Sequence, residues 1–214
     1  MKHHIQPITR DGYLTDQELV SVYSTLWVHR HDPDWEMQSD IVRLILGGGF
    51  RVSEICGLRK PEDCTQDGII IVRKSKTGRM RQVRVTPEYL PWYKAKWHSL
   101  PNGLWFPRSE VNGRGYHRPY STRRMQQLWA DVLAAASVRP LSIHAGRHTY
   151  ATWELATRRL LLHEVQAQLG HSSSRMTQDF YLHSVTECLY EDAPPAWRSV
   201  AVRGPEIKQL LKAV

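Results

Sequence analysis

Six polar side chains occur along the chain in types and contexts that suit phosphoryl transfer. They are Arg51, Lys76, His144, Arg147, His171 and Tyr181. A phosphodiester is an anion, and a planar guanidinium can hold two of its oxygens while it stays charged. An amine or imidazole can donate a proton, and a tyrosine hydroxyl can attack phosphorus once its own proton is removed. The set therefore predicts a site that grips a phosphate, protonates a leaving oxygen and bonds covalently to phosphorus.

Arg51 and Arg147 are the predicted phosphate clamps. Arg51 follows the run Gly47-Gly48-Gly49, and glycines allow the backbone to approach an anion closely. His144 precedes Arg147 by three residues, so the two side chains share a face if the segment is helical. His148 is expected at a different helical phase and is not part of the predicted site. Either arginine alone could be an ordinary surface residue, so the combination carries the prediction.

The remaining three residues supply the predicted proton donors and the nucleophile. Lys76 is placed between two predicted strands, with Lys74 as its alternative, and can protonate a departing 5′ oxygen. His171 follows Leu169-Gly170, and a glycine at a helix end can turn the chain sharply. Tyr181 is the predicted nucleophile, and its ordinary pKa of about 10 requires a proton acceptor or a cationic pocket. The alternative for His171 is a structural role at the helix end, and the alternative for Tyr181 is a core tyrosine whose hydroxyl is hydrogen-bonded.

The composition favours a packed, basic protein that works beside a polyanion. Of 214 residues, 29 are Lys or Arg and 21 are Asp or Glu, which gives a net charge of +8. Basic ribosomal and membrane-surface proteins share this feature. The three cysteines have no zinc-ligand spacing, which predicts reduced thiols and no metal. No apolar run approaches the ~20 residues of a membrane span and no secretory signal is visible, so a cytoplasmic, nucleoid-associated protein without membrane contact is expected.

Apolar periodicity predicts a mainly helical fold with one small antiparallel β-sheet. The predicted helices cover 16–29, 39–46, 121–137, 143–159 and 161–169, and Thr86-Pro87-Glu88 marks the start of another. Residues 68–85 contain two strands joined at Lys76, with Val83 and Val85 on the buried face. Residues 100–120 are rich in Pro, Gly and Asn and are predicted to form a loop.

The chain divides into three predicted parts. Residues 1–14 are a lead-in, residues 15–191 are one catalytic domain, and residues 192–214 are a linker with a C-terminal helix. Thr15 and Glu18 have the spacing of a capping box at the first helix. The apolar faces are predicted from Leu19, Val20, Tyr23 and Trp27 in the first helix and from Met125, Leu128, Trp129, Val132 and Leu133 in the 121–137 helix.

Five strings together resemble the catalytic domain of the tyrosine recombinase family, which includes phage integrases and chromosome-dimer resolvases. They are GFRVSEICGLR (49–59), KSKTG (74–78), LSIHAGRHTYAT (141–152), LGHSS (169–173) and MTQDFYLH (176–183). The resemblance covers about residues 12–185. It implies the fold of these DNA breaking-rejoining enzymes, in which the arginines, Lys76 and the histidines activate the phosphate and Tyr181 forms a 3′-phosphotyrosyl bond. It also implies that Glu54 orients the site.

The resemblance implies a site-specific DNA recombinase that acts on double-stranded DNA as a tetramer of its own copies. A 5′-hydroxyl of a partner strand would resolve the phosphotyrosine, so no cofactor or metal is implied. Candidate DNA contacts are Lys74, Arg79, Arg123 and Arg124. Two alternatives stay open: a type IB topoisomerase, which rejoins the original strand, and a basic DNA-binding module without catalysis.

The chain departs from the family pattern in two ways. Family members usually carry a helical DNA-binding domain ahead of this one, so the chain is either a short enzyme, like the fimbrial-switch inverters, or a catalytic fragment. Tyr181 follows His171 by ten residues, one more than the usual family spacing, and one residue turns a helical side chain by roughly 100°. The tail residues Ile207, Leu210, Leu211 and Val214 are expected to dock on another protomer or to fold back in cis.

Overall fold

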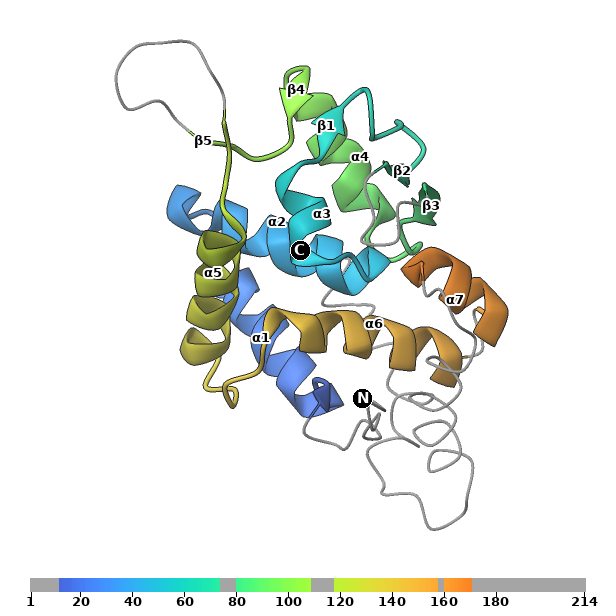
Figure 1. Cartoon of the computed structure of the whole chain (residues 1–214). Coiled ribbons are helices and arrows are strands. Elements are labelled where there is room, and N and C mark those ends of the chain that lie inside the picture. Colours follow the sequence, from blue (N-terminus) through green and yellow to red (C-terminus); the bar gives the residue numbers. More distant parts are fainter. Residues whose placement is uncertain (1–11, 74–79, 109–117, 158–159, 171–214) are drawn as a thin grey trace, which may run out of the picture.

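The computed structural model describes residues 12–73, 80–108, 118–157 and 160–170 (Figure 1). The helices are α1 (Asp16–Val28), the 3₁₀ turn η2 (Pro33–Trp35), α2 (Glu36–Gly48), α3 (Val52–Cys56), α4 (Leu90–Ser99), α5 (Thr122–Ala135), α6 (Ile143–Ala156) and α7 (Leu162–Leu169). The strands form three antiparallel pairs: β1 (Arg59–Lys60) with β4 (Gly103–Leu104), β2 (Ile69–Val72) with β3 (Arg81–Arg84), and β5 (Pro107–Arg108) with β6 (Arg118–Pro119). The predicted fold class, mainly helical with a small antiparallel sheet, is confirmed.

Local sequence signals account for helices α1 and α5. The Thr15 hydroxyl accepts from the Glu18 amide at 3.3 Å, and the Glu18 carboxylate accepts from the Thr15 amide at 2.8 Å, so the predicted capping box is present. The five residues predicted on the inner face of α5 are all buried. On α1 the prediction was partly wrong: the buried residues are Leu19, Val22, Tyr23 and Leu26.

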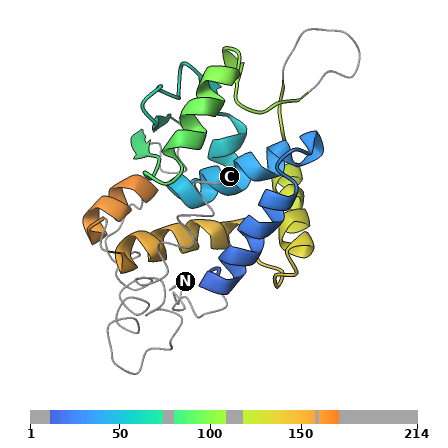
Figure 2. The same ribbon diagram turned by 180° about the vertical axis from the view of Figure 1, so that it is seen from behind.

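Helix α2 is the central element of the fold. It packs against α5 and α6, and α3 also packs against α5. Viewed from behind, α1 crosses this layer beside α5, while α7 lies at the opposite edge (Figure 2). Every residue of α2 from Asp40 to Gly48 is buried, so the glycine run that ends this helix is held inside the molecule.

The β2–β3 hairpin lies against α7 (Figure 1). Ile70 pairs with Val83, and Val72 pairs with Arg81. Val83 and Val85 are buried and Arg84 is exposed, as predicted. The connection at 74–79, which holds Lys76, lies outside the described residues.

Three predictions of local structure were wrong. Two-residue strands occupy 103–104, 107–108 and 118–119 within the predicted loop: the first pairs with distant 59–60, and the other two pair with each other. Helix α4 begins at Leu90 and not at 86–88, since residues 87–89 form a turn. The predicted helix at 39–46 runs from Glu36 to Gly48. No helix of the described residues is long and apolar enough to span a membrane.

Candidate active site

Three of the six predicted residues lie in the described part of the structure, and they come together where α2, α6 and α7 meet. Arg51 follows α2, and His144 and Arg147 lie on α6. Lys76, His171 and Tyr181 lie outside the described residues, as do Lys74 and Arg79. Arg123 and Arg124 are exposed on the first turn of α5.

Arg51 is positioned by a glycine that ends α2. Gly49 has φ +64°, and a Cβ there would lie 2.4 Å from the Tyr150 ring and 2.8 Å from Leu169. Only glycine combines this conformation with this close approach. The chain then turns, Phe50 is buried, and Arg51 becomes the N-cap of α3 with 24% of its side chain exposed.

The Glu54 carboxylate is the central acceptor of the site. Arg51 donates to it from its backbone amide at 2.8 Å and from Nη1 at 3.0 Å. Arg81 on β3 donates through Nη1 at 2.9 Å and Nη2 at 2.7 Å, which is a bidentate pair. Burial raises the pKa of Glu54, but the hydrogen bonds from Arg81 and the Arg51 amide, with the Arg81 charge, outweigh burial and lower that pKa overall. Glu54 is therefore an ionised anchor for two arginines.

Arg147 joins the ends of two helices. Its side chain is almost fully buried, at 1% exposure. Nη1 donates to the Gly49 carbonyl at 2.7 Å, and Nη2 donates to the Leu169 carbonyl. Those carbonyls stand at the C-terminal ends of α2 and α7, where a cation is favoured. Arg147 thus holds the turn before Arg51 against the turn that precedes residue 171.

Two histidines lie on the face of α6 beside these arginines. The rings of His144 and His148 pack edge to face at 4.8 Å. The expectation that His148 has a different phase was wrong, because residues four apart share a helix face. His144 is exposed, but partial loss of solvent around its ring, then the charges of Arg147 and Arg51, lower its pKa. Burial, His144 and Arg147 lower the pKa of His148 to about 4. Both imidazoles are therefore neutral at pH 7, able to accept a proton at one nitrogen and donate from the other.

Helix α7 ends as the sequence predicted. Its C-cap is Gly170 with φ +65°. The Arg81 side chain lies directly against this glycine: a Cβ at Gly170 would be 2.8 Å from Arg81 Cδ. Arg81 Nε also donates to the Gln168 carbonyl at 2.6 Å. Sequence reasoning missed Arg81, although its place two residues before buried Val83 put it on the inner face of its strand.

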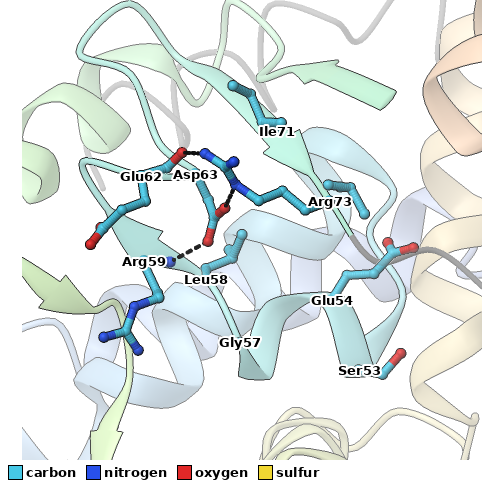
Figure 3. A pocket seen from close by; sticks show the side chains of 10 residues that line it. Ser53, Glu54, Gly57, Leu58, Arg59, Glu62, Asp63, Ile71 and Arg73 are labelled. Atoms are coloured by element: carbon cyan, nitrogen blue, oxygen red, sulfur yellow. Dashed lines mark hydrogen bonds and ion pairs between the residues drawn. The ribbon is translucent and has the colours of Figure 1, made fainter. Parts of the chain in front are cut away.

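A cavity of about 530 Å³ lies between α3, the segment that follows it and β2 (Figure 3). Glu54 is at one end of it. At the other end, Arg73 Nε donates to Asp63 Oδ1 at 2.7 Å and Arg73 Nη2 donates to the Glu62 carbonyl. Asp63 Oδ2 accepts from the Arg59 amide at 3.0 Å. These contacts secure the end of β2 from which the connection to β3 departs. Among the described residues, no cluster of His, Cys, Asp and Glu fits a metal ion.

Several named proteins are similar to this chain in sequence. Tyrosine recombinase XerA of Thermococcus kodakarensis is 32% identical over 139 residues, which are 64% of this chain and 48% of that protein. Tyrosine recombinase XerC of Myxococcus xanthus is 32% identical over 148 residues, 65% of this chain and 48% of its own length. The chain therefore spans about half the length of the curated relatives it matches.

Solved structures share the fold at lower identity. A crystal structure of XerA recombinase superposes with a TM-score of 0.64 at 21% identity, covering 94% of this chain and 66% of that one. The Tn1549 transposon integrase, solved in complex with transposon right end DNA, gives a TM-score of 0.66 at 20% identity, covering 93% and 67%. The sequence pattern of the phage integrase family matches residues 13–187, so this chain belongs to the phage integrase family.

Proposed function

We propose that this chain is a site-specific DNA recombinase that cuts and rejoins strands through a covalent 3′-phosphotyrosine at Tyr181. The observation that carries the proposal is that Arg51, at the N-terminus of α3, lies beside His144 and Arg147 of α6, with Glu54 ion-paired to Arg51. The family match at 13–187 extends over Lys76, His171 and Tyr181 as well.

The chemistry follows from the side chains. The Tyr181 oxygen attacks phosphorus, the bond from phosphorus to the 5′ oxygen breaks, and Lys76 gives that oxygen its proton. Arg51 binds the non-bridging oxygens, on which negative charge grows as the transition state forms. Arg147 is almost fully buried and donates to two backbone carbonyls, so its role as a second clamp requires the phosphate to approach the N–H groups that do not face those carbonyls. Neutral His144 either accepts the tyrosine proton or donates to a phosphate oxygen. A 5′-hydroxyl of a second strand then attacks phosphorus and the tyrosine oxygen leaves, so one phosphodiester replaces another.

Double-stranded DNA and further copies of this chain, as a tetramer on DNA, are the proposed partners. The net charge of +8 suits a phosphate backbone, and the similar proteins include recombinases and an integrase solved with DNA. Lys74, Arg79, Arg123 and Arg124 are proposed phosphate contacts, and His171 is proposed to complete the group around the scissile phosphate.

The test is trapping of the covalent intermediate. The chain is incubated with duplexes that carry randomised sequence around a nick, so that a short cleaved fragment diffuses away and the protein stays attached. The native chain should give an adduct that resists denaturation and whose DNA shares a sequence, and Tyr181→Phe should give none. Tyr190→Phe removes the same hydroxyl elsewhere and should still give the adduct. Adduct formation by Tyr181→Phe, or its absence from the folded native chain, would contradict the proposal.

The rejoining step decides between recombinase and topoisomerase. The DNA recovered from the adducts supplies a recognition sequence. Two copies of it on one plasmid should recombine when the native chain is added. Relaxation of supercoils without any recombinant product would favour the topoisomerase reading instead.

A further inference from the structure

Arg81 is a buried arginine at the junction of three segments. Only 7% of its side chain is exposed. It lies on β3, it makes a bidentate pair with Glu54 of α3, and its Nε donates to the Gln168 carbonyl in the last turn of α7. In sequence, Lys76 precedes β3, Arg51 precedes α3, and His171 follows α7.

We propose that Arg81 is a positioning residue for strand cleavage, which acts through Glu54 on Arg51 and fixes the end of α7. This inference rests on the proposed function above. One guanidinium joins β3, α3 and α7, and each of these elements is followed or preceded in the sequence by a proposed catalytic residue. Each of its three contacts uses a different nitrogen, so the planar fork is required and a lysine ammonium cannot reproduce the set.

The contact with Glu54 controls Arg51. Glu54 Oε1 accepts from both Arg51 Nη1 and Arg81 Nη1, so the two arginines share one oxygen. Without Arg81, the buried carboxylate would have Arg51 as its cationic partner and would draw that guanidinium inward. Arg51 would then be less available to a phosphate. Arg81 therefore keeps Glu54 satisfied while Arg51, at 24% exposure, faces outward.

The contact with α7 explains the glycine at 170. The Arg81 stem passes so close that a Cβ at Gly170 would lie 2.8 Å from its Cδ. The hairpin strand and the end of α7 are thus held together by a hydrogen bond and by close packing. A displacement of about 1 Å in such a group is enough to cost roughly 100-fold in rate.

The experiment measures adduct formation in a single turnover, at saturating concentrations of the selected nicked duplex, beside the affinity for the same DNA. Arg84→Gln is the matched control, because Arg84 lies exposed on the same strand and its loss removes the same charge. Arg81→Gln should slow cleavage about 100-fold, while Arg84→Gln changes it by no more than about threefold. Both should weaken DNA affinity to a similar degree. Arg81→Lys, which keeps a cation beside Glu54, should stay folded and still be slow.

A double variant separates positioning from mere folding. In Arg81→Gln/Glu54→Gln the charge that draws Arg51 inward is gone, so cleavage should be at least about tenfold faster than in Arg81→Gln alone. Thermal unfolding shows which variants are folded at the assay temperature. Cleavage by Arg81→Gln at the control rate, or a double variant no faster than the single, would overturn the inference. A native chain that forms no adduct would instead overturn the proposed function, and this role with it.

Discussion

Among the described residues, Glu54 and Asp40 are both buried beside cations, and their pKa values shift in opposite directions. Glu54 lies on α3, where it accepts from Arg51 and Arg81. Asp40 lies on α2, where Oδ2 pairs with Lys96 Nζ at 2.7 Å and Oδ1 accepts from Trp92 Nε1 at 3.1 Å. The pKa of Glu54 is lowered. The pKa of Asp40 is raised, because burial outweighs the Lys96 and Arg43 charges.

The difference indicates that several well-placed N–H donors, more than a single shared cation, lower the pKa of a buried carboxylate. Glu54 receives four N–H bonds, two from Arg51 and two from Arg81. Asp40 relies on a point charge that it shares, because Lys96 also binds Glu36 at 2.6 Å. Burial lowers the pKa of Lys96, but Asp40 and Glu36 outweigh it there and raise that pKa. The first cluster is built to hold charge, and the second to join α2 to α4.

The largest difference in stability between the Glu54 cluster (Glu54, Arg51 and Arg81) and the Asp40 cluster (Asp40, Lys96 and Glu36) should appear when each carboxylate loses its charge. Glu54→Gln leaves two arginines around a neutral amide, and removing one partner of a buried ion pair costs about 3–5 kcal/mol. Asp40→Asn should cost no more than about 1.5 kcal/mol, because ionising Asp40 is already unfavourable and Lys96 keeps Glu36. Urea unfolding at neutral pH measures both free energies. Equal losses would show that the clusters do not differ in kind.

The sequence predicted features that depend on neighbours along the chain. The capping box at Thr15 and Glu18 and the inner face of α5 need only local spacing, and both were found. Gly49 and Gly170 both have positive φ at helix ends, where glycine is the usual residue. Arg51, His144 and Arg147, which the sequence predicted to act in one site, lie close together in the structure.

What escaped prediction depends on partners far apart in sequence. The Arg147 carbonyl partners, Gly49 and Leu169, are 98 and 22 residues away. The alternation of side chains along a strand was enough to predict that Arg81 faces inward with Val83. Its partner Glu54, however, is 27 residues away in the sequence. The pairing of β1 with β4 likewise overrode a loop-like composition. Local pattern selects candidate residues, whereas tertiary contacts decide which of them are coupled.

Substitution of Gly170 tests how closely the end of α7 packs against Arg81 of the Glu54 cluster. Gly170→Ala places a side chain at φ +65° and 2.8 Å from Arg81 Cδ, which should cost about 1–3 kcal/mol. Gly57→Ala is the control, since a Cβ added at this position would have nothing within 4 Å and the φ of Gly57 is −101°. That change should be neutral or stabilising by up to about 1 kcal/mol. Similar losses in the two variants would argue against close packing at Gly170.

The opposite pKa shifts predict opposite effects of acid. Glu54 has a lowered pKa when folded, so its contribution to stability is present above its ordinary value of 4.5 and is lost as pH falls through the lower folded value. Asp40 has a raised pKa when folded, so its ionisation destabilises the fold at neutral pH. That penalty disappears as pH falls from the folded pKa towards the ordinary value of 3.8.

Each group contributes a slope of at most about 1.4 kcal/mol per pH unit. As pH falls from the raised folded pKa of Asp40 towards 3.8, the native protein should therefore gain stability relative to Asp40→Asn. Below 4.5, the native protein should lose stability relative to Glu54→Gln. Unfolding free energies across this range measure both differences. Parallel curves for native protein and Asp40→Asn would mean that burial does not dominate at Asp40.

The smallest change in stability should come from Glu36, the exposed carboxylate of the Asp40 cluster. Glu36 pairs with Lys96 at 2.6 Å, but 67% of its side chain is exposed, and such pairs contribute about 0–1 kcal/mol. Glu36→Gln alone should cost no more than about 0.5 kcal/mol, because Lys96 still binds Asp40. In an Asp40→Asn background the same change leaves Lys96 beside neither carboxylate, so it should cost more. A double-variant cycle by urea unfolding measures this coupling, and simple additivity would show that Lys96 does not link the two acids.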